Sequence, residues 1–165
     1  MADYVALVLE ILHVVFGVAW IGALFYSVAV LRAALPRVGM PARKEAVRQI
    51  MPVTIRVVPL TAMLTITFGA LLFLQLGSFN PDLLIGSRWG QTILVALALT
   101  LATFTFGMIA VVRTSHRILV HLNEEACGHA EQVVAMQKRV NSGQIVALVL
   151  GLAIIGLMVA ASQRV

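Results

Sequence analysis

Charged residues are scarce in this chain, and their scarcity excludes most water-soluble folds. Asp, Glu, Lys and Arg make up 12% of its 165 residues, whereas hydrophobic residues make up 61% and the mean hydropathy is +0.99. A soluble domain is typically about one quarter charged and about half apolar, and it avoids exposing large apolar patches to water. We therefore expect a lipid-solvated chain that forms one membrane domain, residues 1–165, with no separate soluble domain.

Several patterns that would carry chemistry are also missing. The single cysteine, Cys127, has no partner in the chain with which to form a disulfide. The sequence contains no phosphate-binding glycine loop, no nucleophile elbow and no dense acidic cluster, so nucleotide-driven and hydrolytic functions are not indicated. The N-terminus lacks the basic segment of a secretory signal, so we expect the first apolar stretch to be retained.

Four apolar stretches are long enough to cross a bilayer, which takes about 20 residues as a helix. They are residues 5–35, 57–76, 91–112 and 145–161. Backbone groups in lipid must pair within the segment, which favours helices, and the residue alternation of a membrane β-barrel is absent. The sequence therefore predicts an all-α, four-transmembrane-helix bundle.

Lysine and arginine are distributed unevenly among the connections. Ten of the twelve lie in or beside the first and third connections, at positions 32, 37, 43, 44, 48, 56, 113, 117, 138 and 139. Only Arg88 and Arg164 lie elsewhere. Because basic residues stay on the cytoplasmic side, we expect both termini outside and a place in the inner (plasma) membrane. Topology thus explains the net charge of +5 without a nucleic-acid partner.

The third connection, about residues 114–140, has apolar residues at helical spacing, which predicts an amphipathic cytoplasmic segment. We expect either the third membrane helix or a separate amphipathic helix to continue past the membrane surface there. Within this connection, Asn123 followed by Glu124 and Glu125 has the pattern of a helix start with an acidic first turn.

His13 is the first candidate for a functional residue. It lies in the first apolar stretch, about 10 Å from the outer end at 1.5 Å per residue, and Glu10 shares its helix face. Ionisable residues at such depth usually face the bundle interior and serve a function. Glu10 is shallow enough to reach the interface, and a neutral imidazole can instead tie two helices together.

Met158 lies at the matching depth of the fourth stretch. A histidine and a methionine on facing helices can hold a haem iron axially, and His13 alone can hold a five-coordinate haem. The same pair with Glu10 can hold copper, since a thioether suits Cu(I). A methionine on an apolar helix is otherwise core filler.

A second cluster of metal-ligating residue types lies in the third connection. His121, Glu125 and His129 are four residues apart and would share one helix face, with Cys127 nearby. Gly128 interrupts this stretch, and a polar face at the membrane surface needs no metal to explain it.

The first helix also carries a resemblance. Segment 12–26 (LHVVFGVAWIGALFY) resembles the opening helix of the CopD-like and HemJ-like membrane families, which read Leu-His, six residues, Trp, a small-residue pair and an aromatic. Segment 67–72 (TFGALL) is similar to their glycine-centred segment, and segment 139–141 (RVN) is similar to the approach to the last HemJ-like helix. The resemblance covers most of the chain, but only the first of these motifs is specific.

The resemblance implies a four-helix membrane bundle in which His13 binds b-type haem, or one associated with copper. HemJ-like proteins oxidise protoporphyrinogen, but their lysine is replaced here by Gln91 and Thr92, and their further histidine is absent from segment 104–107. The resemblance therefore supports a cofactor at His13 more than that oxidase reaction.

Three functional hypotheses remain at this point. The first is a haem b protein with a redox or electron-transfer role and a membrane or periplasmic redox partner. The second is a copper-binding or copper-transport protein that uses Glu10, His13 and Met158. The third is a non-catalytic membrane subunit. A homodimer is a further option, since Ala19, Ala23 and Ser27 form a stripe of small residues.

Overall fold

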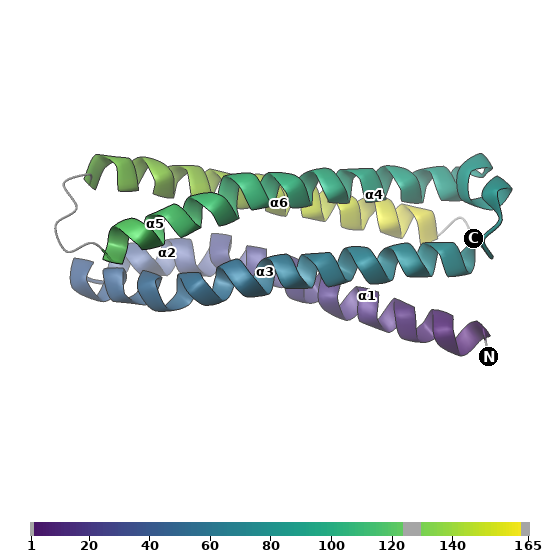
Figure 1. Ribbon diagram of the computed structural model, residues 1–165, viewed down its shortest axis with the longest axis horizontal. Coiled ribbons are helices and arrows are strands. Elements are labelled where there is room, and N and C mark those ends of the chain that lie inside the picture. The colour runs from purple at the N-terminus through teal and green to yellow at the C-terminus, as the bar shows by residue number, and fades with distance from the viewer. Residues whose placement is uncertain (1, 124–129, 163–165) are drawn as a thin grey trace.

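The computed structural model describes residues 2–123 and 130–162 (Figure 1). Over these ranges it contains helices and no strands, in the order α1 (Ala2–Phe25), η1 (Tyr26–Leu31), α2 (Arg32–Ala34), η2 (Leu35–Arg37), α3 (Met40–Leu76), η3 (Asp82–Gly86), α4 (Arg88–Gly107), η4 (Met108–Val112), α5 (Arg113–Asn123) and α6 (Ala130–Ser162). The segments η1, η3 and η4 are π-helical, and η2 is a 3₁₀ turn.

These segments make up four long helices. Each is apolar and long enough to cross a membrane: Tyr4–Arg37, Met40–Leu76, Arg88–Leu122 and Gln132–Ser162. In the most apolar part of each span only 17–22% of the residues are buried inside the protein. The remaining apolar surface needs lipid around it. The prediction of an all-α four-helix bundle is confirmed.

The helix ends follow the breakers in the sequence. Pro36 lies in the 3₁₀ turn η2, and Pro41 occupies the first turn of α3 after Gly39, where a proline has no intrahelical hydrogen bond to lose. At the start of α4 the Ser87 hydroxyl accepts a hydrogen bond from the backbone N–H of Gly90, 3.0 Å away, and so caps that helix.

Two helices are longer than the apolar stretches that predicted them. α3 begins at Met40 and α6 at Ala130, whereas the stretches begin at residues 57 and 145. Hydropathy marks only the part of a helix that lies in lipid: the 37 residues of α3 span about 55 Å, against about 30 Å of hydrocarbon.

In the third connection, Asn123 is the last described residue of α5, and Glu124 and Glu125 lie outside the described ranges, so the helix start expected there stays a prediction. Residues Arg113 to Asn123 of the expected amphipathic segment continue directly from α4 and η4, which is one of the two arrangements that the sequence predicts.

The bundle consists of two antiparallel pairs. α1 packs most extensively on α3, and α4 packs on α6, whereas α1 and α6 share a smaller contact. The pairs meet in a buried cluster of Trp20, Leu24, Ala62 and Ala147.

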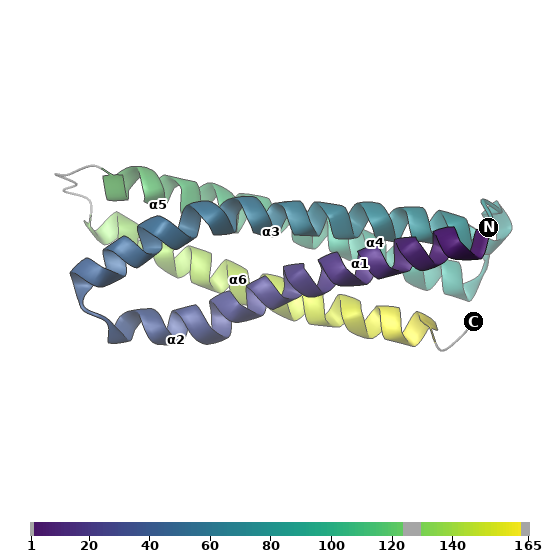
Figure 2. The same cartoon turned by 90° about the horizontal axis from the view of Figure 1, so that it is seen from below.

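The first and last described residues, Ala2 and Ser162, lie with the α3–α4 connection at one end of the bundle, which we call the terminal end (Figures 1 and 2). The stretches that carry ten of the twelve Lys and Arg lie toward the other, the basic end. The charge distribution predicts the same grouping, with both termini and the second connection on one side and the basic first and third connections on the other.

Candidate functional site

His13 lies on α1, half-buried against α3. Its Nδ1 is 2.9 Å from the backbone carbonyl oxygen of Thr65. A carbonyl oxygen only accepts hydrogen bonds, so Nδ1 carries the proton and donates it. In the neutral ring the lone pair is then on Nε2, which is the atom left for a metal or another partner.

Gly69, one turn farther along α3, makes room for this ring. A Cβ at position 69 would lie 2.7 Å from both Nδ1 and Cε1 of His13 and 3.6 Å from Nε2. The edge of the ring that holds Nδ1 therefore rests against the α3 backbone, and Nε2 is farther from it. A glycine without a side chain is what allows this approach.

The contact continues along the two helices in an antiparallel register. His13 of α1 faces Gly69 of α3, and one turn along, Gly17 of α1 faces Thr65 of α3. A Cβ at Gly17 would lie 3.6 Å from the methyl group of Thr65. Between these two pairs, the rings of Phe16 and Phe68 stack with centroids 5.7 Å apart and planes 13° apart. A large residue on one helix thus opposes a small one on the other, which is how membrane helices pack closely without a hydrophobic force between them.

Met158 is half-buried on α6. α1 and α6 approach each other near their middle, where a Cβ on Gly151 would clash with the side chain of Ile21. From there the two helices separate toward the terminal end in both views (Figures 1 and 2). His13 therefore belongs to the α1–α3 pair, whereas Met158 belongs to the α4–α6 pair.

The copper hypothesis needs further ligands beside His13. Glu10 is exposed on α1. Among residues 2–123 and 130–162, no group of three or more His, Cys, Asp or Glu side chains is arranged to hold a metal ion.

The cluster predicted in the third connection falls largely outside the described ranges. His121 lies in the last turn of α5, but Glu125, Cys127 and His129 belong to the residues that the structure does not describe. Their arrangement stays a prediction.

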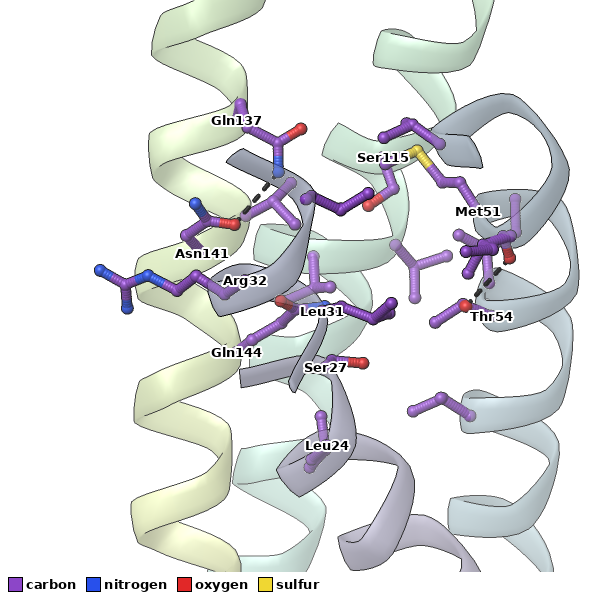
Figure 3. Close-up of a pocket in the computed structure, with 18 residues that line it drawn as sticks. Leu24, Ser27, Leu31, Arg32, Met51, Thr54, Ser115, Gln137, Asn141 and Gln144 are labelled. Carbon is purple, nitrogen blue, oxygen red and sulfur yellow. Dashed lines mark hydrogen bonds between the residues drawn. The ribbon is translucent and has the colours of Figure 1, made fainter. Parts of the chain in front are cut away.

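Figure 3 shows a cavity that lies inside the bundle toward the basic end. Its volume is about 110 Å³, and its walls come from all four long helices. They include the polar side chains of Ser27, Thr54, Ser115, Asn141 and Gln144. A smaller cavity of about 40 Å³ adjoins it and is lined by Trp20 and Phe104 among others, and neither His13 nor Met158 lines either of these cavities.

Sequence reasoning missed these cavity residues. The pattern that could have indicated them is a polar residue just outside an apolar stretch. Ser115 follows the third stretch and lies in the first turn of α5, and Gln144 directly precedes the fourth stretch. Such residues are common at membrane boundaries, so only the assembled bundle shows that they share one cavity.

Comparisons with known proteins add no assignment: no protein-family model, no curated protein and no solved structure matches this chain.

Proposed function

We propose that the chain is a multi-pass protein of the inner (plasma) membrane that holds a b-type haem on Nε2 of His13 and has a redox or electron-transfer role. The observation that carries this proposal is the hydrogen bond from Nδ1 of His13 to the Thr65 carbonyl. Histidines that ligate a metal usually donate their other ring N–H to a carboxylate or a backbone carbonyl, because that bond fixes the tautomer and the ring orientation. The resemblance of segment 12–26 to haem-binding and copper-associated families supports the same residue.

The residues fit the donor chemistry of a haem iron at one axial position. Imidazole is an ordinary axial ligand of haem, and the divergence of α6 from α1 keeps Met158 with the other helix pair. We therefore propose His13 as the axial ligand from this chain. The two cavities, of about 110 and 40 Å³, are too small for a porphyrin, and neither is its site.

In this proposal the haem supplies one-electron chemistry, and the protein supplies ligation and orientation. The Thr65 carbonyl keeps the proton on Nδ1, so Nε2 presents its lone pair. Contact with the α3 backbone at Gly69 prevents the ring from turning. The Phe16–Phe68 stack lies beside this contact and adds to the packing of α1 on α3.

A second candidate function follows from the same geometry, namely a non-catalytic membrane subunit. The Nδ1 of His13 already forms a hydrogen bond with the Thr65 carbonyl of α3, and the ring fills the space over Gly69. The side chain therefore ties α1 to α3 without any ligand. Side-chain hydrogen bonds between membrane helices typically contribute about 0.6 kcal/mol and up to about 2 kcal/mol, enough to explain a histidine at this position.

The deciding experiment is an absorption spectrum with a metal analysis on the protein purified in mild detergent. A Soret band that is lost in His13→Ala, and kept in a matched His116→Ala control at an exposed position of α5, supports the haem proposal. Stoichiometric copper without a Soret band supports instead the alternative that uses Glu10, His13 and Met158. If neither cofactor is present and His13→Ala lowers thermal stability, the histidine is a helix tie and the haem proposal fails.

A further inference from the structure

Apart from Arg32, the cavity toward the basic end is lined by apolar side chains and by uncharged polar side chains that come from all four long helices. Of its polar residues, Ser27 and Thr54 already donate their hydroxyl protons to the carbonyls of Ala23 and Ile50. Within residues 2–123 and 130–162, no protein hydrogen bond engages the Ser115 hydroxyl or the Gln144 amide, and no fully buried polar side-chain atom lacks a partner, so both groups are open to the cavity. In Figure 3 both side chains extend from their helices, α5 and α6, into the space between the helices.

Water alone matches these walls poorly. A buried water typically needs about three hydrogen bonds, and much of the wall is aliphatic, including Leu24, Met51 and Val58. A polar group open to the cavity gains a net 0.5–1.5 kcal/mol, roughly, when an occupant supplies it with a hydrogen-bond partner. An occupant that presents oxygen atoms to Ser115 and Gln144 and carbon atoms to the remaining wall suits both parts of the lining.

The charge of the occupant follows from the only cation in the lining, Arg32. Its alkyl stem forms part of the wall, but Figure 3 shows its guanidinium extending away from the cavity, past α6. A phosphate or carboxylate inside would then be desolvated without a partner, which is strongly unfavourable. The occupant is therefore neutral.

The smaller cavity indicates where a tail would go. It shares four wall residues with the larger one, Leu24, Val58, Val111 and Val112, and continues to Trp20 and Phe104. Its lining is almost entirely apolar. The two cavities together suit a molecule with a small oxygen-bearing ring nearer the basic end and a hydrocarbon chain directed toward the middle of the bundle.

We propose that these adjoining cavities bind the head ring and the first part of the tail of a membrane-soluble quinone. Quinone carbonyl oxygens accept hydrogen bonds, the ring is neutral and flat, and the isoprenoid tail is apolar. This inference does not rest on a haem at His13, because it concerns only binding and uses neither His13 nor the residues that pack around it, such as Gly69 and Phe68.

The two tryptophans of the chain provide the test. Trp20 lines the smaller cavity, whereas Trp89 packs against Phe73 at the terminal end, with ring centroids 5.5 Å apart. The Trp89→Phe variant keeps only Trp20, so its fluorescence reports on the cavity. The Trp20→Phe variant keeps only Trp89, so its fluorescence reports on quenching by quinone dissolved in the bilayer. The probe is a benzoquinone that carries one isoprenoid unit, titrated into haem-free protein in phosphatidylcholine nanodiscs.

We expect saturable quenching of Trp20 and a linear, unsaturated response from Trp89. In the Trp89→Phe background, Ser115→Ala and Gln144→Leu each raise the Kd roughly two- to tenfold, the loss of one hydrogen bond. Thr105→Ala, at an exposed position of α4, leaves the Kd unchanged.

Three results would overturn the proposal. The first is the same linear quenching from both tryptophans. The second is a Kd that neither Ser115→Ala nor Gln144→Leu changes while both variants keep the thermal stability of the parent. The third is displacement of the quinone by a long-chain fatty acid at lower concentration than by a second quinone, which would assign the cavity to an anionic head. A Soret band, present or absent, changes none of these readouts.

Discussion

The α1–α3 contact near the terminal end and the four-helix junction toward the basic end are packed in opposite ways. In the first, His13 and Thr65 each oppose a glycine of the facing helix, and an added Cβ at Gly69 would lie 2.7 Å from the imidazole. In the second, the side chains of four helices leave a cavity of about 110 Å³ with polar groups on its wall. At Gly69 the first region has no space for another methyl group, whereas the second has space for a small ring.

This difference is consistent with two kinds of role. A close backbone contact with an oriented imidazole preserves one geometry, which a helix tie or a metal ligand needs. A cavity with polar groups open to it can gain stability when a ligand binds there and forms hydrogen bonds with them. Substitutions that add or remove a few atoms in each region test whether the two are as different as the structure indicates.

The largest effect is expected at Gly69. Gly69→Ala places a methyl group against the His13 ring, which must leave its position beside the Thr65 carbonyl, so we expect a loss of about 1–3 kcal/mol in unfolding free energy. Thermal or denaturant unfolding in detergent measures it. Gly22→Ala is the matched control, since its Cβ would meet no atom within 4 Å. Equal effects at the two glycines would contradict the close contact.

A smaller effect is expected from the aromatic stack in the same contact. A double-mutant cycle of Phe16→Leu and Phe68→Leu should give a coupling free energy of about 0.5–1.5 kcal/mol, because stacked rings interact beyond the area they bury. The same unfolding assay applies. A coupling near zero would mean that the two rings do not share the geometry that their 5.7 Å separation indicates.

The smallest effect on stability is expected toward the basic end. Val58 lines both cavities, and Val58→Ile adds one methyl group where space exists. We expect a change between zero and about 0.8 kcal/mol of added stability, the burial of one methylene, together with weaker quenching of Trp20 by quinone. Destabilisation as large as that of Gly69→Ala would show that the junction is closed, and the contrast between the regions would disappear.

Much of the fold was predictable because the bilayer leaves few choices. Four apolar stretches had to become helices, and the helix-breaking residues Gly39 and Gly77 flank α3. The lengths of α3 and α6 were not predictable from hydropathy, since a helix outside lipid needs only amphipathic spacing. The candidate site divides in the same way: His13 was identifiable by its depth, but its contact with Thr65 and Gly69 was not.

The sequence by itself determined the number of membrane helices, the clustering of basic residues toward one end and the placement of one imidazole within an apolar span, because hydropathy and charge are properties of each residue in its own segment. Only the tertiary structure decided which glycine meets which large side chain, that His13 and Met158 lie on different helix pairs, and that Ser115 and Gln144 border one cavity. Those outcomes depend on how four helices cross, and in a bilayer the crossing is set by close packing between side chains of different helices.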